Sequence, residues 1–504
     1  MKKYFIYFIL IVGLLIRTFG LNWDQGYHLH PDERMIVMVV EKISYPDNLN
    51  PKFFAYGSFP IYLLKIIAAN LSHLFPLANS YDYLNLIGRF VSSIFDVITI
   101  YVIYLICRLL TKSEKISLIS AIFYATCIFA VQLSHFYAVD TILNCLIYLS
   151  LYFALLFYFY TASKYLVFSS IFTGLAFATK VSAFPILFPI ILIIFLKPNK
   201  IKHLFLFGLF SFSFLFIGMP YAFLDFKTFY RQIMEQQAMT KDAYVFPYTL
   251  QYVKTTAYLY PLKNIFLWGA GPFLSLASLL FFTKFFRNIK IKGFIFMFIF
   301  VFIYFAITGR FAVKFMRYML PLYPFICLTA ALYLKKNKNL FLLFFIPHFF
   351  ILLAFLSIYF YPNTRLDASL WLKNNLPPNS TILREHWDDG LPLGSDFGHK
   401  TEELAMYESD HNPQKWLKIN DQLNRGDYLV IASNRLWKPI TDLKDKYPVS
   451  AKYYQDLFEG KLNYQKVKEF TRFPAIFGVT INDQNADESF TVYDHPQVLI
   501  YKKI

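Results

Sequence analysis

The 504-residue sequence predicts an all-α polytopic membrane domain followed by a small C-terminal α/β domain outside the membrane. Composition is the first observation: 57% of the residues are hydrophobic, 20% are aromatic and only 16% are charged. That leaves too little polar surface for a soluble protein of this length. Long apolar stretches recur as far as residue 361, as in transmembrane helices. From residue 362 onward the composition is that of a soluble domain.

Hydropathy and segment length predict about 11 transmembrane helices. The expected spans are residues 4–20, 88–107, 116–133, 141–159, 166–178, 181–196, 204–222, 265–283, 294–308, 319–334 and 340–361. Lys2 and Lys3 precede the first apolar run as in a signal peptide, but no small-x-small cleavage site follows. We therefore expect the first span to be retained.

The distribution of positive charge predicts the orientation. With the N-terminus inside, the cytoplasmic connections are residues 1–3, 108–115, 160–165, 197–203, 284–292 and 335–338. They hold 16 Lys and Arg residues and one acid, Glu114, in agreement with the positive-inside rule. Residues 362–504 contain 18 Lys and Arg against 20 Asp and Glu, so the net charge of +17 arises in the membrane part and does not indicate nucleic-acid binding. The expected protein is a multi-pass plasma-membrane protein with an extracytoplasmic C-terminal domain.

The predicted membrane domain, residues 1–361, has a long first outer loop at residues 21–87. Within the loop, residues 59–75 are apolar at helical spacing but interrupted by polar side chains, as in a helix lying on the outer leaflet. In the C-terminal domain, TILREHW, DYLVIAS and VLIYKK predict strands, and WLKINDQLNR and YYQDLFEG predict helices. All four cysteines fall in apolar segments, so this domain has no disulfide framework or CxxC metal site.

Ionisable residues recur where the predicted spans reach the outer side. The segment LHPDERM (29–35) follows the first span and contains an acidic pair. The candidate residues are His30, Asp32, Glu33, Asp140, Lys180 and Arg317. Ionisable residues at membrane depth are functional candidates by default. The acidic pair also fits the start of an ordinary solvated helix, and the cations also fit side chains that extend to lipid headgroups.

The motifs resemble those of one enzyme family. HPDE after the first span, the aspartate at the start of the fourth, GLAFATK before the sixth and RYMLPLYP late in the membrane part resemble polyprenyl-phosphate-sugar-dependent glycosyltransferases of the GT-C fold. That group includes protein O-mannosyltransferases and aminoarabinose transferases. The resemblance covers the membrane region. It implies a GT-C-like, inverting hexosyl- or pentosyltransferase that moves a sugar from a polyprenyl-phosphate donor to an extracytoplasmic protein, lipid or glycan.

The resemblance also implies roles for the first outer loop. Asp32 matches the family's first-loop aspartate and is expected to act as general base on the acceptor hydroxyl. Glu33 would be a second catalytic carboxylate that orients Asp32, or the two would bind a divalent cation (Mg²⁺ or Mn²⁺) with His30. Arg34 follows where the family often has a small or apolar residue, and it could pair with Glu33.

The remaining candidate residues are expected to bind the sugar donor. Lys180 and Arg317 are expected to bind the donor phosphate, whose negative charge grows as the bond to the sugar breaks. Asp140 is expected to bind the sugar or a metal ion. Both roles rest on the resemblance.

Two other functions fit parts of the pattern. A lipid-linked glycan transporter, flippase or polymerase-like protein needs polar residues near the bilayer centre or internal repeats, whereas the span interiors are almost uncharged apart from Arg17 and Asp96. A membrane scaffold displaying the C-terminal domain would not need so many spans. Within that domain, REHWDDGLP (384–392) fits a ligand or acceptor site and equally an ordinary turn. The ending DESFTVYDHPQVLIYKK resembles that of membrane proteins of this type, but it suggests no chemistry.

Overall fold

The chain forms two compact units in the computed structural model, which describes residues 4–283, 291–335, 337–394 and 397–504. The first unit comprises Met1–Leu21, His30–Ala238 and Ala257–Leu353. The second comprises Asn22–Leu29, Met239–Thr256 and Ala354–Ile504, so it begins ahead of residue 362 and takes in two outer-loop segments. Of the predicted cytoplasmic connections, residues 1–3, 284–290 and 336 lie outside the described residues.

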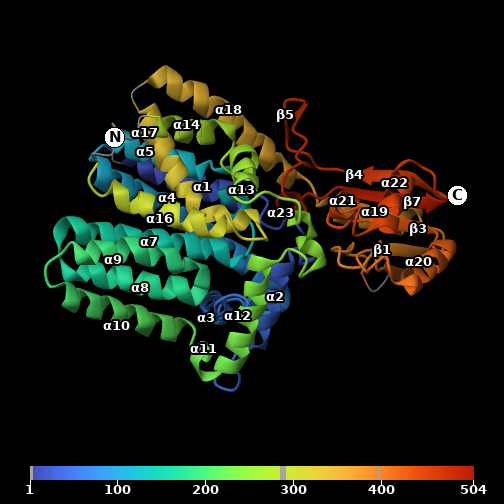
Figure 1. The fold of residues 1–504 in the computed structure, drawn as a ribbon, viewed down its shortest axis with the longest axis horizontal. Coiled ribbons are helices and arrows are strands. Elements are labelled where there is room, and N and C mark those ends of the chain that lie inside the picture. The colour runs from blue at the N-terminus through green and yellow to red at the C-terminus, as the bar shows by residue number, and fades with distance from the viewer. Residues whose placement is uncertain (1–3, 284–290, 336, 395–396) are drawn as a thin grey trace. The chain divides into compact units, whose positions relative to one another are not determined.

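The described part of the first unit is built from helices (Figure 1). Five helices lie in or next to the predicted outer loops: α2 (Pro31–Lys42), α3 (Phe59–Ser72), α11 (Tyr221–Leu224), α12 (Phe226–Lys241) and α13 (Leu259–Asn264). Its more apolar helices are α1 (Phe5–Thr18), α4 (Tyr81–Thr111), α5 (Glu114–Ala125), α6 (Ile128–Ser134), α7 (Val139–Tyr160), α8 (Ser163–Thr179), η3 (Val181–Ile186), α9 (Leu187–Phe195), α10 (Lys200–Gly218), η5 (Ile265–Gly269), α14 (Pro272–Phe282), α16 (Phe294–Thr308), η6 (Met316–Leu322), α17 (Tyr323–Leu334) and α18 (Lys338–Leu356).

Each of the 11 predicted spans falls on one of these helices or on two consecutive ones. Five described helices are long and apolar enough to cross a membrane by themselves, and α5 with α6 forms a sixth candidate that is bent by 58°. The other apolar helices are shorter. The protein is thus a multi-pass membrane protein, while the number of 11 spans and their orientation stay predictions.

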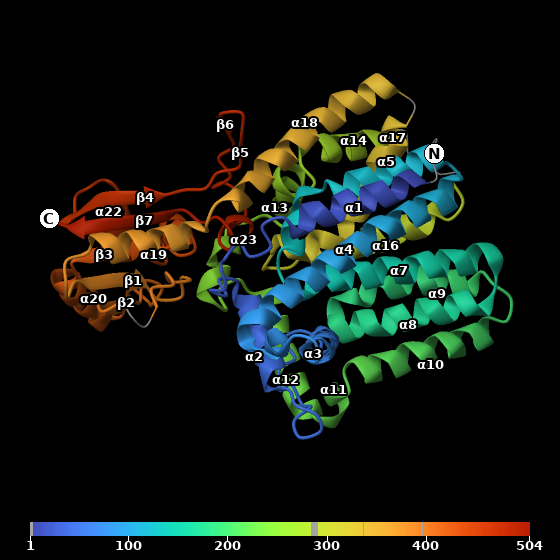
Figure 2. The ribbon, with the colours of Figure 1, turned by 180° about the vertical axis from the view of Figure 1, so that it is seen from behind.

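Packing within the first unit follows the chain order. Helix α8 packs between α7 and α10, and α4 packs against α1, α5 and α7. Figures 1 and 2 show α7, α8, α9 and α10 lying side by side. Helix α3 covers most of the segment 59–75 and buries Ile61, Leu64 and Ala68 while Ile66 is exposed. The predicted helix is therefore present, and its position on the outer leaflet stays a prediction.

Arg17 and Asp96, two charged residues inside predicted spans, neutralise each other. Arg17 Nε donates to Asp96 Oδ2 at 2.6 Å, and both side chains are fully buried. The same guanidinium donates to the carbonyl oxygens of Tyr124 and Ala125, at the break between α5 and α6. A broken helix inside a membrane must have its free carbonyl groups bonded elsewhere, and Arg17 supplies those bonds.

The second unit contains a five-stranded mixed sheet in the order β2-β1-β3-β7-β4. Its strands are β1 (Thr381–Glu385), β2 (Lys400–Leu404), β3 (Tyr428–Ile431), β4 (Tyr464–Phe470) and β7 (Val498–Lys503); β5 (Ala475–Ile476) and β6 (Val479–Thr480) form a separate hairpin. Strand β1 pairs in parallel with β2 and β3, and β7 pairs antiparallel with β3 and β4. The helices are α19 (Thr364–Asn375), α20 (Pro413–Arg425), α21 (Trp437–Asp442), α22 (Pro448–Phe458) and α23 (Glu488–Thr491).

The predicted α/β character of this region is confirmed. Successive residues of β1 enter separate apolar clusters, Leu383 in one and Ile382 in the other, as the two-residue strand repeat requires. The sheet is therefore covered on both faces. The sequence runs expected to form strands became β1, β3 and β7, and those expected to form helices became α20 and α22.

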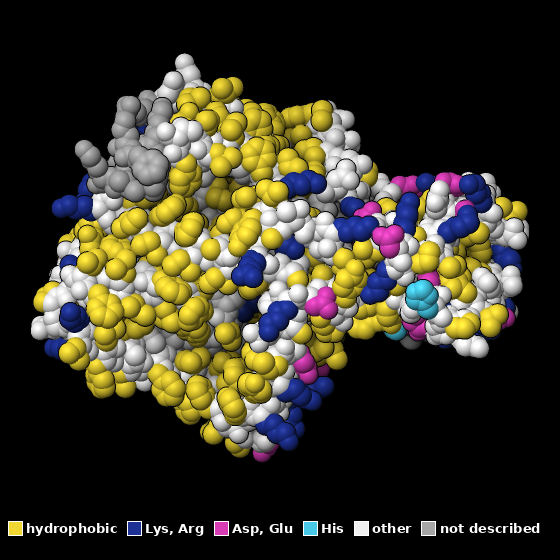
Figure 3. Space-filling view, in the orientation of Figure 1, with side chains coloured by type: hydrophobic (Ala, Val, Ile, Leu, Met, Phe, Trp, Pro, Cys, Tyr) yellow, Lys and Arg dark blue, Asp and Glu magenta, His cyan; other side chains and the backbone are white. Residues whose placement is uncertain are grey.

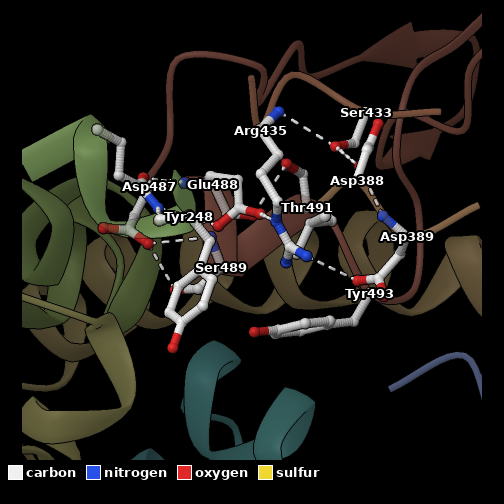
Figure 4. A network of polar contacts seen from close by, with 12 residues as sticks. Tyr248, Asp388, Asp389, Ser433, Arg435, Asp487, Glu488, Ser489, Thr491 and Tyr493 are labelled. Atoms are coloured by element: carbon white, nitrogen blue, oxygen red, sulfur yellow. Dashed lines mark hydrogen bonds and ion pairs between the residues drawn. The ribbon is translucent and has the colours of Figure 1, made fainter. Parts of the chain in front are cut away.

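The ending DESFTVYDHPQVLIYKK builds a buried polar network in the second unit (Figure 4). Arg435 donates to Glu488 at 2.6 Å and to Asp389 at 2.8 Å. Burial and the flanking carboxylates act in opposite directions on the guanidinium, and the carboxylates raise the pKa of Arg435 well above its ordinary value. The buried His495 ring lies between Asp494 and Asp483, at 2.5 and 2.8 Å. The ending is thus explained by packing inside this unit.

Candidate functional site

The acidic pair lies in the first turn of α2. His30 is the N-cap, Pro31 is the first helical residue, and Asp32 and Glu33 follow. Proline fits the first helical position because its backbone donates no hydrogen bond, and carboxylates there interact favourably with the helix dipole. His30 Nδ1 accepts a hydrogen bond from the Glu33 amide at 3.4 Å, so the imidazole holds the helix start.

Glu33 is engaged by a distant arginine. Its carboxylate accepts hydrogen bonds from Nε and Nη2 of Arg89 on α4, each at 2.8 Å, and from the Tyr137 amide at 3.1 Å. Both charged side chains are fully buried. The structure therefore gives Glu33 an ion pair with Arg89, a residue distant in the sequence. The suggested pairing with Arg34 stays a prediction. Such a bidentate pair fixes α2 against α4.

Asp32 points to a different cation. Its carboxylate forms an ion pair with Arg317 on η6, a contact between residues 285 positions apart. The pair is partly accessible, with 23% of the Asp32 side chain and 13% of the Arg317 side chain exposed. The Arg317 guanidinium lies 5.0 Å from the centre of the Phe315 ring. Two adjacent carboxylates thus have different environments, one sealed and one reachable.

Asp140 and Lys180 form a second pair. Lys180 Nζ donates to Asp140 Oδ1 at 2.7 Å. Asp140 is the second residue of α7 and Lys180 ends α8, so the pair joins two helix ends. Lys180 Nζ also lies 4.8 Å from the centre of the Tyr318 ring and 5.8 Å from that of Tyr56.

Tyr318 connects the two ion pairs, because it follows Arg317 directly and contacts Lys180. The structure thereby brings together Asp32, Arg317, Asp140 and Lys180 from four separate elements. Among the described side chains, none forms a hydrogen bond with Asp140 Oδ2 or Arg317 Nε, although both atoms are buried. A buried polar atom without a partner is costly, so both atoms have bonding capacity for a substrate.

The acidic pair does not fit a metal site. Both oxygens of Glu33 accept hydrogen bonds from Arg89, and Asp32 is held by Arg317. His30 uses Nδ1 to cap α2. Within the described residues, no group of three or more His, Cys, Asp or Glu side chains is arranged to hold a metal ion. We therefore derive no step through a metal at this site.

Sequence reasoning missed Arg89, which is as buried as Glu33. A signal was present: Asn85, Arg89, Ser93 and Asp96 recur every three or four residues along the apolar α4, which places a polar stripe on one side of the helix. The buried His135 ring hydrogen-bonds to two backbone oxygens, through Nδ1 to Val131 O and through Nε2 to Phe19 O.

Comparisons with known proteins show that the fold is similar to that of membrane glycosyltransferases with the GT-C fold. The family described as dolichyl-phosphate-mannose-protein mannosyltransferase matches residues 84–222. That stretch contains Arg89, Asp140 and Lys180. None of the curated proteins compared with the chain matches it.

Three solved structures resemble this chain over nearly its whole length. Archaeal oligosaccharyltransferase AglB from Archaeoglobus fulgidus, in complex with an inhibitory peptide and a dolichol-phosphate, is 14% identical; the match covers 100% of this chain and 89% of that chain, with a TM-score of 0.53. The Archaeoglobus fulgidus oligosaccharyltransferase with Zn and sulfate is 15% identical, with coverage of 98% and 88% and a TM-score of 0.52. ArnT from Cupriavidus metallidurans bound to undecaprenyl phosphate is 11% identical, with coverage of 99% and 98% and a TM-score of 0.53. At these identities the likeness shows the fold, and the predicted resemblance to GT-C proteins is confirmed.

Proposed function

We propose that the protein is an integral-membrane glycosyltransferase that moves a sugar from a polyprenyl-phosphate donor to an extracytoplasmic hydroxyl-bearing acceptor. One observation carries the proposal: a reachable carboxylate, Asp32, is paired with Arg317, and the next residue, Tyr318, contacts a second cation, Lys180. The similar structures bind dolichol-phosphate or undecaprenyl phosphate. That lipid phosphate chemistry matches paired cations at a membrane boundary.

In the proposed reaction Asp32 is the general base. The acceptor hydroxyl oxygen attacks the anomeric carbon while its proton passes to Asp32. The bond between the anomeric carbon and the phosphate oxygen breaks, and the lipid phosphate leaves with the electron pair. The products are the glycosylated acceptor, the polyprenyl phosphate and a protonated Asp32, which later releases its proton to water. Attack opposite the leaving phosphate inverts the anomeric centre.

Arg317 and Lys180 would bind the phosphate. Negative charge grows on the phosphate in the transition state, and fixed cations in a poorly hydrated site stabilise it. An arginine beside a carboxylate favours the carboxylate's charged form, so Asp32 accepts a proton most readily after Arg317 turns to the phosphate. Asp140, released by Lys180 in the same way, would bind a sugar hydroxyl through Oδ2. Glu33 would act by fixing α2 through Arg89.

The proposal includes a place in the cell. The enzyme would lie in the plasma membrane with its N-terminus in the cytoplasm, and its acceptor, a protein, lipid or glycan, would arrive from the extracytoplasmic side. The orientation is supported by the excess of Lys and Arg in the predicted cytoplasmic connections.

The test uses purified full-length protein in lipid nanodiscs with a polyprenyl phosphate carrying a radiolabelled sugar. Asp32→Asn keeps the shape of the side chain and removes the base, so we expect release of lipid phosphate to fall by about a hundredfold or more. Asp47→Asn, which changes an exposed carboxylate of the same loop, is the matched control. Unchanged release by Asp32→Asn would remove the assigned base.

A binding measurement separates the donor site from the base. Lys180→Met should weaken binding of polyprenyl phosphate, whereas Asp32→Asn should bind it at least as well as the unchanged protein, because Arg317 is then freed of its carboxylate. If neither Lys180→Met nor Arg317→Met weakens binding, the phosphate lies elsewhere and the proposed reaction geometry is wrong.

A further inference from the structure

Helix α12 has three distinct faces along its length. On one face Phe229 packs edge-on against the ring of Phe54, with ring centres 5.8 Å apart. Gln232 on the same face exchanges two hydrogen bonds with the backbone of the first outer loop, accepting from the Phe54 amide at 2.6 Å and donating to the Lys52 carbonyl at 3.0 Å. This face fixes the helix to the protein.

The second face is apolar and exposed. Phe226, Tyr230 and Met234 follow one another at four-residue spacing, so their side chains share one side of the helix. Their exposed fractions are 59%, 55% and 39%. The third face is charged: Arg231 and Glu235 form an exposed ion pair.

The apolar face of α12 is continuous with the exposed apolar surface of α10. Helix α10 is a candidate span of which only 17% is buried inside the protein, and its exposed side chains include Phe212 and Phe216. The ring of Phe223 contacts both of them, at 5.5 and 5.6 Å between centres. Phe223 belongs to α11, directly before α12, and Phe226 then contacts Tyr230.

Figure 3 shows hydrophobic side chains spread over the face of the first unit that carries α8 and α10. In Figures 1 and 2, α12 runs across the end of the α7–α10 group rather than along it. A helix in that position, apolar on one exposed face and charged on the next, has the pattern of a helix that lies in the plane of the membrane surface.

We propose that α12 is a membrane-surface helix whose face of Phe226, Tyr230 and Met234 is buried in the outer leaflet beside α10. The occupant of this face is lipid. Aromatic side chains favour the boundary between headgroups and acyl chains, and Lys227 and Arg231 lie where they can reach anionic headgroups. Because Gln232 holds the first outer loop, this anchoring ties that loop to the membrane surface.

Site-directed spin labelling tests the proposal in full-length protein reconstituted in nanodiscs of phosphatidylethanolamine and phosphatidylglycerol. A nitroxide is attached at Tyr230→Cys or Phe226→Cys, and Glu235→Cys is the matched control on the charged face. The four native cysteines are buried and stay unlabelled in the folded protein. Molecular oxygen is concentrated in the bilayer, whereas a nickel chelate stays in water.

We expect labels at positions 230 and 226 to collide more with oxygen than with the nickel chelate, and the label at position 235 to show the reverse. Equal nickel access at positions 230 and 235 would overturn the proposal, because both faces would then be in water. Protection of position 230 from oxygen and nickel alike would also overturn it, since the face would then be covered by protein.

Discussion

Replacing each of the two adjacent carboxylates of α2 by its amide should change the stability of the protein by different amounts. Glu33→Gln removes the charge that faces Arg89 in a fully buried pair. The hydrogen bonds that its carboxylate accepts include two from the guanidinium and one from the Tyr137 amide. Leaving a buried arginine uncompensated typically costs about 3–5 kcal/mol. Asp32→Asn alters a partly accessible pair, in which water can still reach the guanidinium, so a smaller loss is expected.

The assay uses the buried cysteines. A thiol-reactive dye becomes fluorescent as heating exposes Cys107, Cys127, Cys145 and Cys327, all of which are buried in the folded protein. We expect Glu33→Gln to lower the apparent Tm by roughly 5–10 °C and Asp32→Asn to lower it by about 2 °C or less. Asp32→Asn should lose turnover in a protein that stays stable, whereas Glu33→Gln should mainly lose stability.

A double substitution makes the reasoning refutable. Replacing Glu33 and Arg89 together by Gln and Met removes both charges, so the double variant should be more stable than the sum of the single effects predicts, by about 2 kcal/mol or more. Additive effects would refute the view that the pair fixes α2. Equal loss of stability in Glu33→Gln and Asp32→Asn would refute the distinction between a sealed and a reachable carboxylate.

Three further predictions concern the second unit. Burial lowers the pKa of His495, but the flanking aspartates outweigh it and raise the pKa to about 10 from an ordinary 6.5. The stabilisation from its positive charge is therefore fully present below pH 6.5 and is lost as the pH rises toward 10. His495→Gln should remove this fall in unfolding free energy, measured by denaturant unfolding followed by tryptophan emission. Burial raises the pKa of Glu385 to about 8 from 4.5, so stability falls as the pH rises from 4.5 to 8, and Glu385→Gln should be the more stable form above pH 8, by on the order of 3 kcal/mol. Arg365 Nη2 donates to the carbonyl oxygens of Leu29, Val492 and Tyr493. Arg365→Gln should therefore speed hydrogen exchange in residues 22–29 and 487–494 and leave exchange in β1 unchanged. Equal exchange rates in these two segments with and without the substitution would contradict this role.

Local patterns carried the parts of the fold that the sequence could predict. Proline and two acids after His30 predicted the start of α2, and a short apolar run predicted β1, because both signals come from near neighbours in the chain. Apolar length located the spans for the same reason. The break between α5 and α6, in the middle of a predicted span, was not predicted. It depends on hydrogen bonds from Arg17, which lies over a hundred residues away in the sequence.

Partner choice could not be predicted in this way. The guanidinium that forms the buried ion pair with Glu33 belongs to Arg89, which lies 56 positions along the chain. Helix α4 brings Arg89 into a site closed to water, where its charge requires a carboxylate, and neighbouring residues in the sequence do not reveal that burial. A single sequence gives the polar stripe on α4 but not which helix faces it.

The pairing of acids with cations suggests the order in which the donor and the acceptor bind. Without substrate, Arg317 and Lys180 are each neutralised by a carboxylate, Asp32 and Asp140, because an unpaired charge at membrane depth is costly. In the proposed reaction a donor phosphate would replace the carboxylates as the partner of both cations. We infer that the donor binds first and that its phosphate frees Asp32 to accept the acceptor's proton. Free polyprenyl phosphate should then inhibit competitively against the donor and not against the acceptor; competition against the acceptor in initial-rate kinetics would contradict this order.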